Sequence, residues 1–338
     1  MKYYLPRIST KLQLADRLEL NPHELHWLMN QRRGKSDPNS SSKHYRCRWI
    51  RKRSGGWRLI EAPKSKLRYC QRILLDQIFS LIPPHPLSFG FCRGRRVIDF
   101  AKPHTNKDAC LLFDLADFFT SVTTGRVFGL LRKLGYNRDV AHAIALLTTV
   151  ETSHRTLTVE HPEATFSIQS PQHLRRHLAQ GAPTSPAVAN LCAYRLDLRL
   201  SALARSIGGV CYSRYADDIL FSGDEDLARQ SKRLAALVGA IAIEEGFELN
   251  YRKTKLLRSN QRQSVAGMVL NEKLNVSRNS FDQLKAILHN CVRFGPTSQN
   301  RERHPEFRAH LDGRIQWLET VNAKRGRKLR AIFERIQW

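Results

Sequence analysis

Residues 210–223 read VCYSRYADDILFSG, in which two short apolar runs flank the paired carboxylates of Asp217 and Asp218. Another apolar run, ACLLF at 109–113, ends directly before Asp114. Short apolar runs of this kind are typical of buried strands. We therefore expect buried strands that carry these aspartates to a hairpin tip.

The aspartates stand out because the chain is strongly basic. It has 56 Lys and Arg against 30 Asp and Glu, a net charge of +26. Carboxylates at the ends of buried strands are unfavourable unless a cation compensates them. Two divalent ions about 3.5–4 Å apart would do so and would support phosphoryl transfer to a 3′-hydroxyl, and hard carboxylate oxygens suit magnesium. The alternative for residues 215–218 is an ordinary turn with two exposed aspartates.

Three short segments follow one another along the chain: FDLADFF at 113–119, QGAPTSP at 180–186 and YADD at 215–218. Together they resemble motifs A, B and C of reverse transcriptases. The resemblance implies an α+β right-hand polymerase with fingers, a palm that carries an antiparallel sheet, and a helical thumb. The implied reaction is RNA-directed DNA synthesis with two Mg²⁺ ions, for which Mn²⁺ is a substitute.

The same resemblance divides the chain into regions. We expect N-terminal helices at 1–45, fingers at 46–108, a palm at 109–272 that includes part of the fingers at 125–185, and a basic helical thumb at 273–338. Local patterns agree: residues 8–30 have apolar positions at helical spacing, and HYRCRWIRKRSGGWRLIEAP at 44–63 reads as two strands around a Gly55-Gly56 turn.

The resemblance also implies roles for individual residues. Metal ligands are Asp114, Leu115 through its backbone, Asp217 and Asp218. Nucleotide contacts are Lys52, Arg58, Asp117, Phe118, Phe119 and Gln180. Lys253, in a segment that looks like motif D, is the implied general acid for the leaving pyrophosphate.

Some of these roles have structural alternatives. Phe119 is placed where the family has a bulky ring that clashes with a ribose 2′-hydroxyl, yet one of Phe118 and Phe119 must be ordinary core, since adjacent strand residues face opposite ways. Asp117 fits a supporting role as well as a contact. The basic residues near Gly55 could simply be a solvated turn.

Within the family, QGAPTSP, the upstream GFCRGRR at 90–96 and the compact length resemble retron enzymes more than group II intron enzymes. Two segments depart from the retron pattern, at 100–104 (FAKPH) and 265–267 (VAG), both associated with recognition of the retron RNA. Expected RNA contacts are Arg93, Arg95, His104, Arg325, Arg327, Lys328 and Arg330.

A retron enzyme implies particular partners. These are a cognate structured noncoding RNA that serves as template and primer, its branched RNA-linked DNA product, deoxynucleotides and a separate effector protein in antiphage defence. A reverse transcriptase of another lineage, intron-linked or diversity-generating, is one alternative. A polymerase-shaped RNA-binding scaffold is another.

Composition sets further expectations. The charge predicts a nucleic-acid partner, and no apolar run reaches about 18 residues, so we expect no membrane association and a bacterial cytoplasmic location. Seven scattered cysteines suggest neither disulfides nor zinc. His173 and His177 have zinc-ligand spacing but lack further ligands nearby, so residues 151–177 read instead as an inserted hairpin or an RNA-facing loop.

Overall fold

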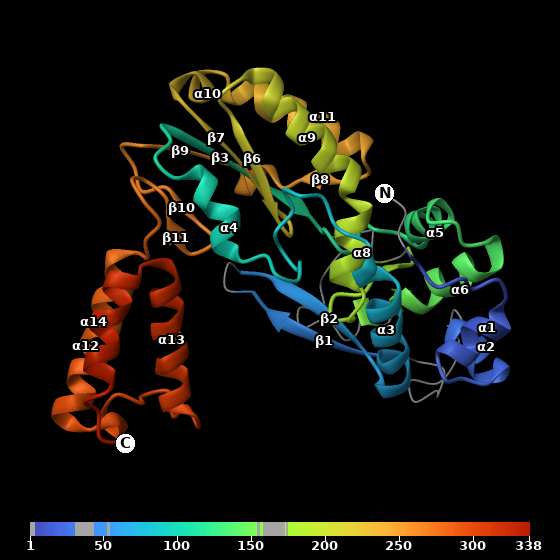
Figure 1. Cartoon of the computed structure of the whole chain (residues 1–338), viewed down its shortest axis with the longest axis horizontal. Helices are drawn as coiled ribbons and strands as arrows, with labels where there is room; N and C mark the ends of the chain where they lie inside the picture. Colours follow the sequence, from blue (N-terminus) through green and yellow to red (C-terminus); the bar gives the residue numbers. More distant parts are fainter. Residues whose placement is uncertain (1–3, 31–43, 53–54, 154–155, 158–172, 174) are drawn as a thin grey trace.

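The structure is a computed structural model that describes residues 4–30, 44–52, 55–153, 156–157, 173 and 175–338. Figure 1 shows an arch: a sheet and its helices form the top, a hairpin and several helices form one side, and three helices near the C-terminus form the other side. This is the palm, fingers and thumb arrangement that the motifs predict. The exact region boundaries stay predictions.

The palm is built on an antiparallel sheet with the strand order β6-β7-β3-β8, and β9 also pairs with β3. Its strands are β3 (Ala109–Ala116), β6 (Cys211–Tyr215), β7 (Asp218–Gly223), β8 (Glu248–Leu249) and β9 (Lys255–Arg258). The expected strands before Asp114 and around Asp217 are therefore present. Helices α9 (Tyr194–Ile207), α10 (Glu225–Arg229) and α11 (Ser231–Glu244) lie beside the sheet (Figure 1).

Both faces of this sheet are buried, which explains the apolar runs. Phe113 and Phe221 belong to the large core shared with the palm helices and the fingers. Cys110 and Leu220, whose side chains point to the other face, belong to a second core shared with the thumb. Because successive strand residues point to opposite faces, the Asp114 and Asp218 side chains lie on the thumb-side face with Leu220.

The fingers begin with an antiparallel hairpin of β1 (Tyr45–Arg51) and β2 (Trp57–Pro63), as predicted. Two helices found within residues 8–30, α1 (Lys11–Arg17) and α2 (Pro22–Met29), pack against each other and against α6 (Arg138–Thr148) (Figure 1). Asn21 and Glu24 form a capping box that starts α2. The remaining elements are α3 (Ser65–Gln77), η1 (Phe79–Leu81), α5 (Thr124–Lys133), α6 (Arg138–Thr148), β4 (Thr149–Val150), β5 (His177–Leu178) and α8 (Ser185–Cys192).

The thumb consists of α12 (Arg278–Phe294), η5 (Pro296–Ser298), α13 (Phe307–Val321) and α14 (Ala323–Phe333). A hairpin of β10 (Ser264–Val265) and β11 (Met268–Val269) joins it to the palm. Gly326 lets α13 and α14 approach closely, because a Cβ there would lie 2.4 Å from Glu319 Cα. Helix α13 faces the fingers in Figure 1. Short helices α4 (Val97–Ala101), η2 (Lys102–His104) and η4 (Tyr251–Lys253) complete the palm region.

Candidate active site

Three aspartates from two separate segments meet at the end of the palm sheet. Asp114 on β3 is directly paired with Asp218 on β7, so both side chains leave the same face of the sheet. Asp217 lies at the tip of the β6–β7 hairpin, where Ala216 has a positive φ of 56°. The Leu115 N–H donates to the Asp217 carbonyl over 2.9 Å, which ties the tip to β3.

The electrostatics of this cluster reflect crowded negative charge. Burial, reinforced by the charges of Asp217 and Asp114, raises the pKa of Asp218 to about 6. Burial also raises the pKa of Asp217, Asp114 adds to the effect, and the positive charges of Lys253 and Arg58 oppose it. Carboxylates that repel one another in this way are stabilised by bound cations.

The donor set suits a divalent metal ion. All three side chains offer hard carboxylate oxygens, the ligands that Mg²⁺ prefers. In the part of the chain that the structure describes, no group of three His, Cys, Asp or Glu side chains, these aspartates included, is arranged as a complete metal site. Instead the Lys253 ammonium donates to one Asp114 oxygen over 2.9 Å and supplies part of the missing positive charge. The Leu115 side chain is buried, so its contribution would come from the backbone.

The turn after β3 carries the three residues after Leu115 that are predicted to contact the nucleotide, namely Asp117, Phe118 and Phe119. Asp117 is exposed and adopts a φ of 48°. The Phe118 ring is core: it is 4% exposed and stacks with Phe247 at 5.8 Å between centroids, so only its backbone faces the site. Phe119 is half-buried and packs at 5.9 Å from the exposed ring of Phe91. Of the two adjacent phenylalanines, Phe118 is therefore core and Phe119 is more accessible; the role of Phe119 as a sugar gate stays a prediction.

The fingers hairpin is hydrogen-bonded to the segment that resembles motif B. The Glu61 N–H on β2 donates to the Gln180 carbonyl over 2.9 Å. Gly181 has a φ of 137°, and a Cβ there would lie 3.1 Å from the Glu61 carbonyl oxygen, so only glycine fits without strain. The exposed Arg58, three residues earlier on β2, is close enough to lower the pKa of Asp217. Lys52 lies at the exposed turn of the hairpin.

A buried carboxylate and imidazole hold this junction together. The Glu61 carboxylate, 1% exposed, accepts hydrogen bonds from Thr152 and from His177 Nε2, the latter at 3.0 Å. His177 therefore supports the fold and is not a zinc ligand, although the His173 ring lies 5.3 Å away. Most of residues 151–177, including His154 and His161, lie outside the described residues.

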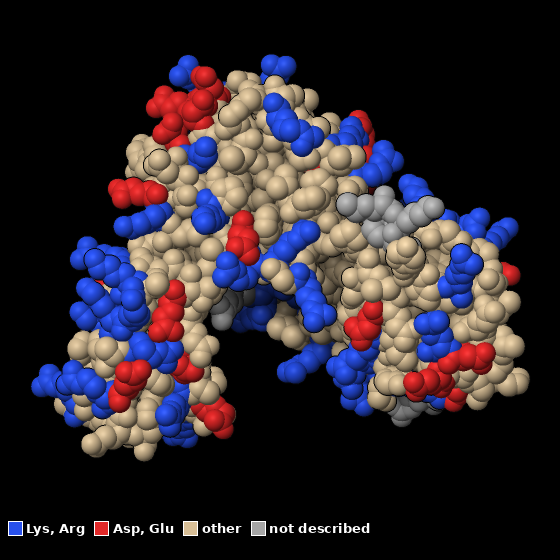
Figure 2. All heavy atoms as spheres, viewed as in Figure 1, with Lys and Arg blue, Asp and Glu red and all other residues tan. Residues whose placement is uncertain are grey.

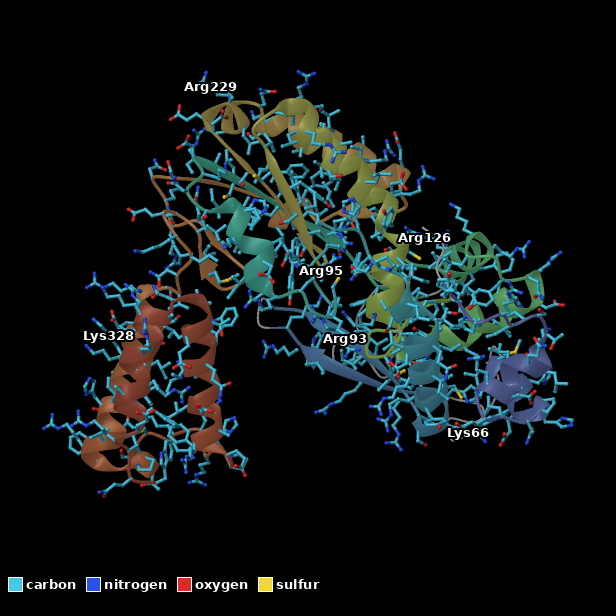
Figure 3. The ribbon with its side chains drawn as sticks, in the orientation of Figure 1. Lys66, Arg93, Arg95, Arg126, Arg229 and Lys328 are labelled. Carbon is cyan, nitrogen blue, oxygen red and sulfur yellow. The ribbon has the colours of Figure 1, made fainter. Side chains whose placement is uncertain are left out.

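The residues predicted to contact RNA divide into different groups. Arg93 is exposed beside the fingers hairpin (Figure 3), whereas the Arg95 guanidinium donates to the carbonyls of His85 and Ser88. A contact between His104 and RNA is contradicted, because its side chain is fully buried between β6 and β7.

The thumb candidates also differ from one another. Arg330 is paired with Asp312 and Glu319 within the thumb, so its charge is already neutralised. Arg325 donates to Asn275, whereas Arg327 and Lys328 are exposed. Lys328 lies on the side of the thumb away from the fingers (Figure 3). RNA that contacts Lys328 would therefore pass over the outer face of the thumb.

Basic side chains gather along the hollow between thumb and fingers (Figure 2). A channel of this charge suits a polyanion such as a template and primer duplex. No helix in the described ranges is both long and apolar enough to cross a membrane.

Sequence patterns missed two features of this site. One is the Glu61 and His177 pair. The other is a buried ion pair between Arg214 and Asp197 beneath the β6–β7 hairpin. Only the position of Arg214, directly before the YADD segment, could have pointed to the second.

Comparison with known proteins agrees with this geometry. The family model described as reverse transcriptase (RNA-dependent DNA polymerase) matches residues 50–283. The retron Mx65 reverse transcriptase of Myxococcus xanthus is 40% identical over 292 residues, which cover 86% of this chain and 65% of that enzyme. The retron Mx162 enzyme of the same organism is 32% identical, covering 98% of this chain and 68% of its own length. The chain therefore spans about two thirds of the length of these two relatives.

More distant likenesses were also found. The retron Ec86 reverse transcriptase of Escherichia coli is 27% identical and covers 83% of this chain and 77% of that enzyme. A solved telomerase structure from Candida albicans has a TM-score of 0.42 at 14% identity, covering 83% of this chain and 56% of that chain. The family match and the two Myxococcus relatives assign the protein to a family. The chain belongs to the reverse transcriptase family and, within it, to the bacterial retron reverse transcriptases.

Proposed function

We propose that this protein is an RNA-directed DNA polymerase that copies a cognate structured RNA. The observation that carries the proposal is the pairing of Asp114 with Asp218 on adjacent strands, with Asp217 at the hairpin tip beside them. A basic chain has no need of clustered carboxylates beside phosphates unless metal ions bind there. The same argument disfavours a scaffold that only binds RNA.

The three aspartates would hold two Mg²⁺ ions, or Mn²⁺ in their place, with help from the Leu115 carbonyl. When bound, these ions would lower the pKa of the primer hydroxyl and neutralise the triphosphate. Arg58 and Lys52 of the fingers hairpin would bind the triphosphate oxygens, and the backbone at Asp117 and Phe118 would cradle them.

Other residues would select and orient the incoming deoxynucleotide. The Phe119 ring would occupy the space of a ribose 2′-hydroxyl, and Gln180 would contact the nucleotide from motif B. Lys253 lies at the carboxylates. From there it would donate a proton to the leaving pyrophosphate.

The retron relatives support a more specific proposal about substrate and partners. The template and primer would be a structured noncoding RNA, primed from one of its 2′-hydroxyls, and the product a branched RNA-linked DNA. A separate effector protein in antiphage defence, in the bacterial cytoplasm, extends this proposal. RNA would be gripped by exposed cations, among them Arg93, Arg327 and Lys328, through phosphates and 2′-hydroxyls.

The test is to sequence the nucleic acid that copurifies with the wild type and with Asp217→Ala plus Asp218→Ala, before and after RNase and debranching enzyme. The control is Glu225→Ala plus Asp226→Ala, an adjacent acidic pair that is exposed beyond the end of β7. DNA covalently joined to one RNA in the wild type and the control, and absent from the active-site variant, supports the proposal.

Each other outcome contradicts part of it. Unbranched DNA would indicate a reverse transcriptase of another lineage. RNA alone in every sample would indicate a binding scaffold. DNA in the active-site variant as well would remove the aspartates from the chemistry.

A further inference from the structure

Beneath the catalytic hairpin lies an ion pair without any contact with solvent. The side chains of Arg214 on β6 and Asp197 on α9 are both 0% exposed. Arg214 Nε donates to Asp197 Oδ1 and Nη2 donates to Asp197 Oδ2, each over 2.7 Å. A buried pair of this kind contributes little net stability, because removing both charges from water costs several kcal/mol. The presence of this ion pair is therefore better explained by the fixed geometry that it imposes than by a gain in stability.

The remaining N–H groups of the Arg214 guanidinium donate to the hairpin and to two neighbouring side chains. Nη1 donates to the Ala216 carbonyl over 2.7 Å and to Asn190 Oδ1 over 3.0 Å. Nη2 also donates to Ser88 Oγ over 3.0 Å. Ala216 is the residue with positive φ that directly precedes Asp217. Arg214 thus fixes the peptide group from which a predicted metal ligand extends.

A second segment packs against the preceding peptide, which joins Tyr215 to Ala216. Asn190 Nδ2 donates to the Gly90 carbonyl over 2.7 Å. A Cβ on Gly90 would lie 2.3 Å from the Ala216 nitrogen and 3.0 Å from the Tyr215 carbonyl carbon. Gly90 opens the GFCRGRR segment, so its lack of a side chain allows that segment to pack directly against the hairpin tip.

Only arginine can make this set of contacts. Its guanidinium presents five donors in a rigid planar fork, whereas a lysine ammonium has three donors around one atom. Lysine would keep the positive charge beside Asp197 but could not also hold Ala216, Asn190 and Ser88. The Ala216 peptide would then be free to turn.

We propose that Arg214, held by Asp197 and Asn190 and opposed by Gly90, is a positioning residue that fixes the Asp217 carboxylate relative to Asp114 for metal binding. The inference rests on the polymerase function proposed above. Metal sites require ligands placed to within about 0.5 Å, and a displacement of about 1 Å can lower a rate by about 100-fold.

Two variants test the device from its two sides, each with a matched control. Arg214→Lys is compared with Arg199→Lys. Arg199 lies on the same helix as Asp197, but it pairs with Glu244 and Glu245, far from the hairpin. Gly90→Ala is compared with Gly129→Ala, a position in α5 where a Cβ meets nothing within 4 Å.

Four quantities are measured on each purified protein: the thermal unfolding midpoint, Mn²⁺ affinity by electron paramagnetic resonance, and kcat and KM for dTTP on an oligo(dT)-primed poly(rA) template. We expect both test variants to be folded, to bind Mn²⁺ several-fold more weakly, and to lose about 10- to 100-fold in kcat with KM within about threefold. The two controls should match the wild type.

The outcomes separate the two proposals. Wild-type Mn²⁺ affinity and kcat in folded Arg214→Lys and Gly90→Ala would overturn the positioning role. If Arg214→Lys does not fold, Gly90→Ala decides on the same criteria. A wild-type protein that does not extend the primer would contradict the proposed function, and the Mn²⁺ measurement would still test the positioning of Asp217.

Discussion

The burial of His104 leads to a quantitative prediction about stability at acid pH. His104 Nδ1 lies 2.6 Å from Ser222 Oγ, and Nε2 lies 2.7 Å from Ser213 Oγ. Since Ser213 already donates to the Phe100 carbonyl, it accepts from Nε2–H, and Nδ1 accepts from Ser222. The ring therefore ties β6 to β7 as a neutral tautomer.

Its pKa determines the size of the effect. Burial, with a smaller contribution from the charge of Lys107, lowers the pKa of His104 from 6.5 to about 3. Between these two values the unfolded chain binds a proton that the folded chain does not, so stability falls as the pH falls. Each pH unit costs about 1.4 kcal/mol, so acidification to two units below 6.5 removes about 3 kcal/mol.

The assay is urea unfolding of the wild type and His104→Gln at about pH 7 and about pH 4.5. Comparing the two proteins cancels the contributions of all other titrating groups. The wild type should lose about 3 kcal/mol more than His104→Gln over this interval. Equal losses in the two proteins would refute the reasoning, because they would mean that His104 titrates alike in the folded and unfolded chains.

Further predictions concern the active site. Phe119→Val should raise incorporation of ribonucleotides relative to deoxynucleotides by at least about tenfold in single-nucleotide extension, a change of about 1.4 kcal/mol in relative barrier; an unchanged ratio would exclude Phe119 as the sugar gate. Gly181→Ala should lower the free energy of unfolding by about 2–4 kcal/mol in urea titrations, since it adds backbone strain to a clash with Glu61. Gly129→Ala, within helix α5, should leave it unchanged or raise it by less than about 1 kcal/mol, because alanine is favoured over glycine in a helix. Arg58→Ala should raise the KM for dTTP by about tenfold or more, because a charge-assisted contact to the triphosphate is lost, and a KM unaffected by this change would assign Arg58 to the solvated turn. The Mg²⁺ concentration for half-maximal activity should rise as the pH falls below about 6, where a proton competes for Asp218; a constant requirement would place Asp218 outside the metal site.

The sequence alone determined the family and the local elements of the fold, and it pointed to the three aspartates that we propose as metal ligands. Short apolar runs and turn residues report on backbone periodicity, which is why β3, the β6–β7 hairpin and the fingers hairpin were predictable. Phe118 and Phe119 also point in different directions, but they lie in the turn after β3, so the alternation of strand residues is not the reason. Motif order then supplied the right-hand arrangement.

Tertiary structure decided how distant residues are used. No local pattern distinguishes His104, which is buried between two strands, from a histidine that contacts RNA. Arg330 looks like a free cation in AKRGRKLR, yet its charge is neutralised by acids on α13. These outcomes depend on packing between segments that are far apart in the chain.

The active site shows the same division. The sequence identified Asp114, Asp217 and Asp218, but the strand register that pairs Asp114 with Asp218 arises only when β3 and β7 meet. The approach of Lys253 to Asp114 and the ion pair between Arg214 and Asp197 likewise join separate segments. A sequence states which side chains are available. Their distances, burial and pKa values follow from the packed fold, because each depends on neighbours that the chain brings together only on folding.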